Sequence, residues 1–315
     1  MSAAEAFDSG APEGAVDCLI IGAGPAGLTA AIYAARFRLK IQVIDAGASR
    51  AALIPCTRNH AGFPEGVSGH ELLARMAAQA AKYGASIEHG AVTRLATGEG
   101  GFLAETTIGD IRARTVLLAT GVTNRRPAMP EDVHRAAVAA GRLRYCPVCD
   151  GFEVIGQDVA VIGTAERGLK EAKFLRSYTD KVTLVAPAGP HEFGADERTA
   201  LAEANIAVVD GPADGFELTD QRFSFSCALG RRSFDAVYPA LGSDVHSDLA
   251  KTLGANLTSE DCIKVDSHQR TSVAGLYAAG DVVIGLDQIS HAMGEAGVAA
   301  TTIRNDLAAQ RPLYC

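Results

Sequence analysis

Residues 17–45 constrain the fold more than any other part of the chain. They read as a short apolar strand, a glycine-rich turn, an alanine-rich helix and a second strand. The turn has the pattern GxGxxG, with Gly22 suited to a tight turn, Gly24 to close approach of a pyrophosphate, and Gly27 to close helix–strand packing. Asp45 follows 23 positions after Gly22 and can accept hydrogen bonds from ribose hydroxyls. The segment therefore predicts a dinucleotide site.

A second unit of the same kind begins about 140 residues later. Residues 158–163 read as a strand, 166–177 as a helix and 181–185 as a strand. Near the end of the chain, 275–281 read as a strand with an acid at its tip, and 289–307 as a long helix of small residues. These patterns predict an α/β fold with two Rossmann-like, three-layer dinucleotide-binding domains, the second inserted in the first.

Composition excludes several classes of protein. With 315 residues, 48% of them hydrophobic, the chain can bury a large core and has the length of about two domains. No apolar run approaches the ~20 residues needed to cross a bilayer, and the first residues are not those of a secretion signal. A net charge of −8 opposes nucleic-acid binding. We expect a cytoplasmic protein that binds neither nucleic acid nor membrane.

Two of the seven cysteines form a motif, Cys146-Pro147-Val148-Cys149. A zinc site would need two more ligands at close spacing, and the chain has no second pair, so we expect no metal. Pro147 fits the first position of a helix, which would place the Cys146 sulfur near free N–H groups and make it the attacking thiolate. Asp150 follows directly and could move the thiol proton. We expect Cys18, Cys227 and Cys262 to be reduced core or half-buried residues.

The chain resembles the low-molecular-weight thioredoxin reductases over nearly its full length. The residues that carry the resemblance are Gly22-Ala-Gly-Pro-Ala-Gly27 with Ala30–Ala35, Ala119-Thr-Gly121, Cys146-Pro-Val-Cys-Asp-Gly151, and Ala278-Ala-Gly-Asp281 with Gln288-Ile289. The resemblance implies FAD in the first unit, a homodimer, an FAD domain at 1–124 and 243–315, and a pyridine-nucleotide-type domain at 125–242. It also implies that Cys149 faces the flavin, Cys146 meets the partner disulfide, and Asp150 handles protons.

The same resemblance implies a set of flavin-binding residues. Asp281 would hold the ribityl or pyrophosphate region, and the helix that Gln288 and Ile289 open would stabilise reduced flavin. His291 could stabilise charge or shuttle a proton, or serve packing alone. The C-terminal Tyr314 could cover an exposed flavin face, or lie in a disordered end. The expected FAD-binding residues are Gly22, Gly24, Pro25, Ala26, Gly27, Asp45, Asn59, Thr120, Gly121, Asp281, Gln288, Ile289 and Tyr314.

The second unit departs from the family pattern. It has Ala165 where the phosphate-approach glycine belongs, and residues 186–190 lack both the acid that would hold a ribose hydroxyl and the His-Arg-Arg that binds the 2′-phosphate in thioredoxin reductases. We therefore expect NADPH to be a poor donor, although a variant but working NAD(P)H site stays open. By analogy, the chain is similar to some thioredoxin-reductase-like flavoproteins with eroded motifs, which are reduced by ferredoxin or hold another ligand, even a second flavin, in the vacated cleft.

These patterns leave four readings of the function. The leading one is an enzyme that reduces a thioredoxin-like protein with electrons from ferredoxin or another donor. The alternatives are an NAD(P)H-dependent thioredoxin reductase, an FAD-dependent oxidase of small-molecule dithiols, and a flavoprotein scaffold without turnover. The intact Cys-x-x-Cys-Asp sequence opposes the last of these.

Overall fold

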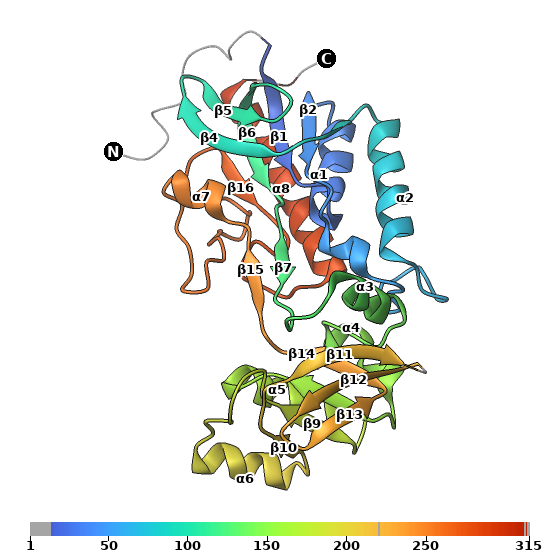
Figure 1. Ribbon diagram of the computed structural model, residues 1–315. Helices are drawn as coiled ribbons and strands as arrows, with labels where there is room; N and C mark the ends of the chain where they lie inside the picture. The colour runs from blue at the N-terminus through green and yellow to red at the C-terminus, as the bar shows by residue number, and fades with distance from the viewer. Residues whose placement is uncertain (1–13, 220, 312, 314–315) are drawn as a thin grey trace. The chain divides into compact units, whose positions relative to one another are not determined.

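The computed structural model describes residues 14–219, 221–311 and 313, and the chain divides into two compact units (Figure 1). The first unit comprises Met1–Ala52, Gly69–Thr123 and Val245–Cys315, and the second comprises Leu53–Ser68 and Asn124–Asp244. The segment Leu53–Ser68 thus groups with the second unit, whereas our division placed it in the first. In the second unit Arg58 lies 3.9 Å from the Glu153 carboxylate.

The first unit is built around one mixed sheet. Its strands run in the order β3-β2-β1-β6-β5-β4, and β16 also pairs with β6. β3, β2, β1, β6 and β16 pair parallel with one another, whereas β5 pairs antiparallel with both β6 and β4. The elements of this unit, in chain order, are β1 (Val16–Ile21), α1 (Pro25–Arg36), β2 (Ile41–Asp45), α2 (Gly69–Lys82), β3 (Ser86–His89), β4 (Val92–Gly98), β5 (Gly101–Thr106), β6 (Ile111–Leu118), α7 (Asp248–Thr252), β16 (Leu276–Ala278) and α8 (Ile289–Gln310).

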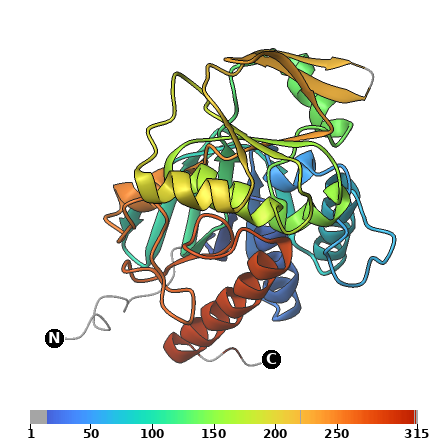
Figure 2. The same ribbon diagram turned by 90° about the horizontal axis from the view of Figure 1, so that it is seen from below.

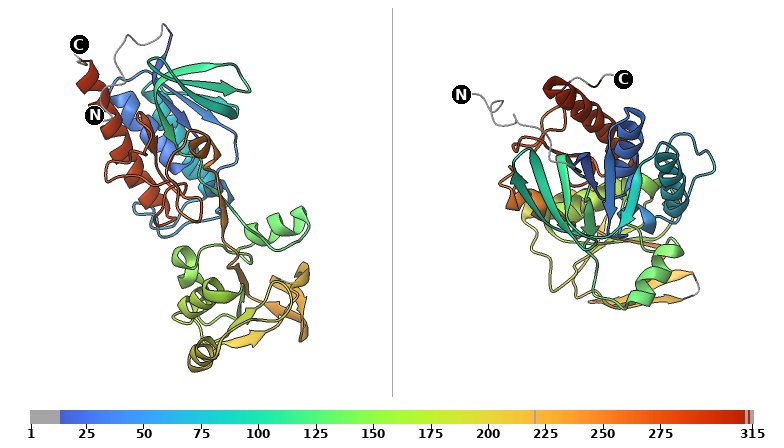
Figure 3. Two further views of the ribbon diagram at one scale, coloured as in Figure 1. Left: turned by 90° about the vertical axis from the view of Figure 1, so that its left-hand side faces the viewer. Right: turned by 90° about the horizontal axis from the view of Figure 1, so that it is seen from above.

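Alternation along β1 places a hydrophobic cluster on each face of this sheet. Ile20 packs into a cluster with the small residues of α1 and α8, because alanines let these helices lie close to the strands. Leu19 points into the other cluster, which residues from β5 and from the segment after α7 complete. α8 lies beside α1 along its length (Figures 2 and 3).

Two strands, β5 and β16, pair with different halves of the same edge of β6. Its first half, from Ile111 to Ala113, pairs antiparallel with β5, and its second half, from Val116 to Leu118, pairs parallel with β16. β16 therefore completes the sheet beside the carboxyl-terminal half of β6. In an open α/β sheet, ligands bind outside the carboxyl ends of the parallel strands.

The second unit has a smaller parallel sheet and a three-stranded antiparallel sheet. The parallel strands run in the order β10-β9-β8-β14, and the antiparallel sheet in the order β11-β12-β13. The elements are α3 (Glu131–Ala139), α4 (Pro147–Asp150), the 3-10 helix η2 (Gly151–Val154), β8 (Val159–Ile162), α5 (Ala165–Leu175), β9 (Val182–Val185), α6 (Ala195–Glu203), β10 (Ala207–Val209), β11 (Asp214–Thr219), β12 (Arg222–Cys227), β13 (Gly230–Phe234) and β14 (Ala236–Pro239). At the boundaries between the units lie the 3-10 helix η1 (Arg50–Leu53) and the paired strands β7 (Val122–Asn124) and β15 (Ser243–Val245).

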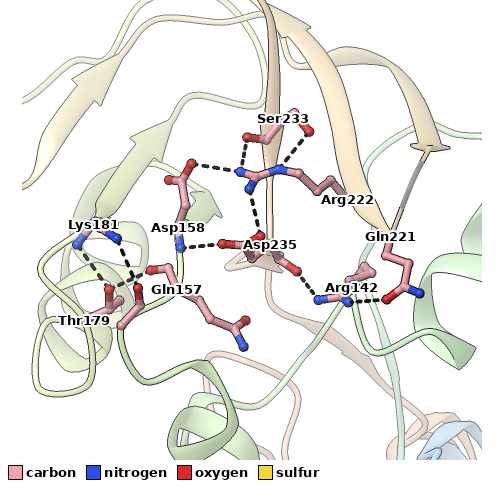
Figure 4. A network of polar contacts seen from close by, with 10 residues as sticks. Arg142, Gln157, Asp158, Thr179, Lys181, Gln221, Arg222, Ser233 and Asp235 are labelled. Carbon is pink, nitrogen blue, oxygen red and sulfur yellow. Dashed lines mark hydrogen bonds and ion pairs between the residues drawn. The ribbon is translucent and has the colours of Figure 1, made fainter.

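A polar network ties the two sheets of the second unit together (Figure 4). Arg222 of β12 contacts Asp158 at 3.1 Å and Asp235 at 2.9 Å, and Asp235 also accepts a hydrogen bond from the Asp158 backbone N–H. Beside them, the Arg142 guanidinium donates to the Asp235 carbonyl oxygen at 3.1 Å. The network fixes the antiparallel sheet at the start of β8.

Both units thus have the α/β architecture expected from the sequence. Among the described helices, none combines the length and the apolar character that crossing a membrane requires.

Candidate functional site

Cys146 and Cys149 are joined by a disulfide at the start of α4, with their Cα atoms 5.2 Å apart. Cys146 caps the helix in an extended conformation, Pro147 takes its first position, and the Cys149 N–H points to the Cys146 sulfur at 3.1 Å. Cys18, Cys56, Cys227 and Cys262 are free. The sequence thus folds locally so that a two-electron redox pair lies at a helix start.

Asp150 is held on both of its carboxylate oxygens. The Arg144 guanidinium donates to one at 2.8 Å, and the Tyr238 hydroxyl donates to the other at 2.8 Å. Burial raises the pKa of Asp150 above its ordinary value, and Arg144 opposes that rise through its charge and its hydrogen bond. Tyr238 lies on β14 and is fully buried, and burial likewise raises its pKa.

Glu171, on α5, adds a second buried carboxyl to this region. Burial raises the pKa of Glu171 to about 7, with Asp150 adding to the rise and Arg167 opposing it. One oxygen of Glu171 is buried and has no hydrogen-bond partner among the residues described. Sequence reasoning missed Tyr238 and Glu171, because they approach Asp150 only through the fold. It also missed Arg144, which is six residues before Asp150 but lies outside the motif over 146–151.

The glycine turn between β1 and α1 fits a dinucleotide. Gly22 has φ 103°, and a Cβ atom there would lie 2.4 Å from the Ala119 carbonyl oxygen. A Cβ atom at Gly27 would lie 1.8 Å from the Gly22 carbonyl oxygen, so helix and turn touch there. At Gly24 a Cβ atom would meet only the Ser49 hydroxyl, at 3.4 Å, which leaves the backbone open to a phosphate.

Asp45 stabilises this turn as well as ending β2. Its two carboxylate oxygens accept hydrogen bonds from the Ala23 N–H at 2.9 Å and the Gly47 N–H at 3.0 Å. A carboxylate offers about four lone-pair sites, so these bonds leave Asp45 able to accept from a ribose. Pro25 occupies the first helical position of α1, and Ala26 is buried behind it.

The carboxyl ends of β6 and β16 bring further predicted residues to this edge of the first unit. Gly280 approaches Ala26, since a Cβ atom at Gly280 would lie 2.9 Å from the Ala26 Cβ. Beyond β6, the Thr120 hydroxyl donates to the His246 carbonyl oxygen at 2.6 Å, and Gly121 has φ 64°. The glycine turn, residues 119–121 and residues 280–281 therefore lie together.

Arg50 forms ion pairs with two aspartates at this edge. Its guanidinium contacts Asp281 at 2.9 Å and Asp287 at 2.8 Å. Burial and the neighbouring Asp287 raise the pKa of Asp281, and Arg50 opposes the rise. No local pattern in the sequence marked Arg50, because its partners are more than 200 residues away.

His291 lies in the first turn of α8, which Gln288 caps and Ile289 begins. Its Nε2 atom lies 3.1 Å from Glu295, whose other oxygen accepts the Gly280 N–H at 2.7 Å. Burial raises the pKa of the Glu295 carboxyl, which is one-tenth exposed. The four-residue spacing from His291 was a signal that could have identified Glu295 in the sequence.

Asn59 belongs to the second unit, where it accepts a hydrogen bond from the Thr57 hydroxyl at 2.9 Å. Tyr314 lies outside the described residues. Among those residues, no group of three or more His, Cys, Asp or Glu side chains could hold a metal ion.

The turn between β8 and α5 of the second unit differs from the glycine turn between β1 and α1. Ala165 begins α5 with φ 50°, in the left-handed region that favours glycine. After β9, the Gly211 N–H donates to the Gly189 carbonyl oxygen at 2.7 Å, and the Ala213 N–H donates to that of Pro187 at 3.2 Å. The loop over 186–190 is therefore bonded to the chain that follows β10.

Comparison with known proteins agrees with this arrangement. The family model for pyridine nucleotide-disulphide oxidoreductase matches residues 16–296. Thioredoxin reductase of Streptomyces coelicolor is 31% identical over 281 residues, covering 84% of this chain and 85% of the relative, and that of Mycolicibacterium smegmatis is 32% identical over 285 residues, covering 85% and 88%. The crystal structure of thioredoxin reductase from Streptococcus pyogenes superposes with a TM-score of 0.85 at 28% identity, covering 95% of this chain and all of that one.

The fold is shared with the solved thioredoxin reductase, and the family match extends over both units of the chain. The chain therefore belongs to the pyridine nucleotide-disulphide oxidoreductase family, as a flavin-dependent disulfide oxidoreductase of the thioredoxin reductase type.

Proposed function

We propose that this enzyme passes electrons between FAD, the Cys146–Cys149 pair and the disulfide of a thioredoxin-like protein, with a donor other than NADPH. The observation that carries the proposal is the disulfide at the start of α4, next to the clamped carboxylate of Asp150. Reduction of the pair takes two electrons and two protons, and the reduced pair returns both when it opens the partner disulfide.

We assign FAD to the first unit. Backbone N–H groups at the start of α1 would bind the pyrophosphate, Asp45 the ribose, and Asp281 the ribityl region. FAD, when bound, supplies two-electron transfer to and from a thiol pair. His291, oriented by Glu295, and the start of α8 would stabilise negative charge at this edge. By the resemblance to the thioredoxin reductases, Thr120 and Gly121 contribute to this site.

A protein partner is supported by the apolar surface around the cysteine pair. Val148 is 50% exposed, Phe152 74% and Ile155 55%. Large exposed aromatic and aliphatic side chains of this kind are typical of contact sites for other proteins. Relatives named thioredoxin reductase make a thioredoxin-like protein the partner that we propose, and Cys146 the sulfur that it meets.

The donor is proposed from the altered second unit. A methyl group at Ala165 crowds the place where a pyrophosphate would approach, and the loop after β9 offers no acid or basic cluster to a ribose or a 2′-phosphate. Each lost contact costs about 1–3 kcal/mol of binding free energy. Ferredoxin is a donor that would bypass this site, and a second flavin or another ligand could occupy it.

Two alternatives share the flavin and the cysteine pair. An NAD(P)H-dependent thioredoxin reductase would need the second unit to bind nucleotide despite Ala165. A small-molecule dithiol oxidase would run the same exchange in the opposite direction and pass electrons to oxygen. Beyond the reaction itself, we propose a cytoplasmic homodimer, with the inserted pyridine-nucleotide-type domain carrying the redox pair.

Anaerobic stopped-flow mixing of the yellow protein with NADPH, NADH, reduced ferredoxin or dithionite tests the donor. We expect NADPH and NADH to bleach the flavin slowly or not at all, and dithionite or a low-potential protein donor to reduce it fully. Rapid, saturable bleaching by micromolar NADPH would establish the first alternative. Rapid oxygen consumption with a small dithiol, and none with reduced thioredoxin, would establish the second.

The cysteine pair is tested by Cys149→Ser. This variant should keep its FAD absorbance and lose reduction of the partner disulfide, because the electron path is cut while the flavin site is whole. Cys227→Ser, which changes a free cysteine in the second unit, is the matched control and should keep turnover. Undiminished turnover of Cys149→Ser would contradict the assignment.

A further inference from the structure

Arg144 has the geometry to control the carboxylate beside the redox pair. It lies two residues before Cys146, and its guanidinium donates to Asp150 at 2.8 Å with both side chains largely buried, at 18% and 24% exposure. Its backbone N–H donates to the Val237 carbonyl oxygen at 2.9 Å, so the main chain is fixed to β14. Tyr238, the next residue of that strand, holds the other oxygen of Asp150.

The charges that face Asp150 come from four segments. Arg144, from the segment before α4, is the cation that contacts it, and Tyr238 of β14 is neutral. Glu153, in η2, adds negative charge, and Glu171, on α5, adds negative charge once the pH rises past its pKa of about 7, with Arg167 of α5 opposing it. Without Arg144, Asp150 would be a buried carboxylate with acidic neighbours and one neutral donor.

We propose that Arg144 is a positioning residue for thiol–disulfide exchange, which holds the Asp150 carboxylate ionised and aligned beside the Cys146–Cys149 pair. The inference rests on the proposed function, in which Asp150 moves the thiol proton. Tyr238 fixes the direction of the carboxylate, whereas the positive charge of Arg144, in contact with Asp150, keeps the carboxylate ionised near neutral pH.

The exchange can be written with a small dithiol, which isolates it from the natural donor and partner. One sulfur of dithiothreitol attacks the disulfide and displaces a cysteine thiolate, and its second sulfur then displaces the other cysteine and closes the ring. Dithiothreitol loses two electrons and two protons and becomes the cyclic disulfide, and Cys146 and Cys149 become thiols. The ionised Asp150 accepts a proton from an attacking thiol and returns it to a leaving cysteine sulfur.

Removing the cation should shift the pH at which this exchange operates. An arginine beside an aspartate lowers the pKa of the carboxyl by about 1–3 units. We therefore expect Arg144→Met to move both the Asp150 titration midpoint and the midpoint of the exchange rate upward by about 1–3 units. Arg144→Lys, which restores a positive charge, should return most of the shift.

The experiment uses the FAD-loaded protein and up to five variants. The rate of Cys146–Cys149 reduction by dithiothreitol is followed from pH 4.5 to 9 by acid quench and alkylation, and the Asp150 carboxyl is titrated by ¹³C NMR, with Asp150→Asn identifying its signal. Arg142→Met is the matched control, since Arg142 contacts the Asp235 carbonyl and Gln221 instead of Asp150. If Arg144→Met fails to bind FAD or to fold, Arg144→Gln provides the same neutral test.

The outcomes separate the two claims. Upward shifts in Arg144→Met or Arg144→Gln, with an unshifted control, support the inference. Wild-type midpoints in a folded neutral variant overturn it, and so does an equal shift in Arg142→Met. If Asp150→Asn itself shows the wild-type rate profile, the proton role of Asp150 in the proposed function is wrong, and the inference falls with it.

Discussion

At the scale of single residues, Glu171 makes the stability of the folded protein depend on pH. Burial raises its pKa to about 7, so the native protein binds this proton more tightly than the unfolded chain does. The contribution of Glu171 to stability is therefore full below the ordinary pKa of 4.5. It decreases as the pH rises toward 7, because the unfolded chain loses this proton at a lower pH than the native protein does.

Glu171→Gln should abolish this decrease in stability with rising pH. We expect the variant to be about 1–3 kcal/mol more stable than the wild type at pH 8 and nearly equal to it at pH 4, as measured by chemical unfolding at several pH values. Glu166→Gln, on the same helix, is the control. The Glu166–Lys170 pair lowers the pKa of the exposed Glu166 carboxyl, so the contribution of Glu166 to the free energy of unfolding does not change with pH above about 5. Parallel curves for wild type and Glu171→Gln would contradict the assignment.

At the scale of elements, the start of α5 is strained by Ala165. A left-handed conformation costs a residue with a Cβ atom about 1–2 kcal/mol, and the extra flexibility of glycine in the unfolded chain offsets about 0.4–1 kcal/mol of that. Ala165→Gly should therefore stabilise the protein by up to about 1 kcal/mol, measured as a higher unfolding midpoint. NADPH should still bleach its flavin slowly, because the ribose end has nothing to hold it. Fast bleaching would show that Ala165 alone blocks the site.

The elements most accurately predicted from the sequence are those with local signals. The two strand–turn–helix units lie where glycine spacing and apolar runs placed them, with boundaries such as Pro25–Arg36 and Val182–Val185 within a residue or two of the expectation. The antiparallel sheet of the second unit was not predicted, because its strands are short and partly polar. Arg222, in its central strand, contacts Asp158, which is 64 residues earlier in the sequence.

The candidate site divides in the same way. Cys146, Cys149 and the glycines of the first turn carry spacing patterns that appear in the sequence itself. Arg50 and Glu171 lie near the acids they influence only in the folded chain, so no spacing pattern identifies them. Arg144 is local to Asp150 but lies outside the motif over 146–151. Glu295 lies between these cases, since its spacing from His291 is local but its contact with the Gly280 N–H is not.

At the scale of the whole molecule, ligand binding should divide the chain into two responses. FAD would stabilise only the unit that binds it, by RT ln(1 + [L]/Kd), or about 2.7 kcal/mol at a hundredfold excess over Kd. Calorimetry of protein stripped of FAD should therefore show one transition lowered and the other, that of the second unit, little changed. If both transitions moved to lower temperature equally, or if only that of the second unit did, the assignment of FAD to the first unit would be contradicted.

The shared edge of β6 has a consequence for biosynthesis. The strand and helix that complete the first unit, β16 and α8, come from residues 276–310 and are translated last. While the ribosome is still adding them, β6 has an unpaired half-edge and α1 an uncovered apolar face, but residues 124–244 have already emerged. Domains fold as units as they are synthesised, so the inserted unit closes before its host. A nascent chain truncated before Leu276 would therefore carry a folded insert on an incomplete host, and would depend on chaperones to stay out of aggregates.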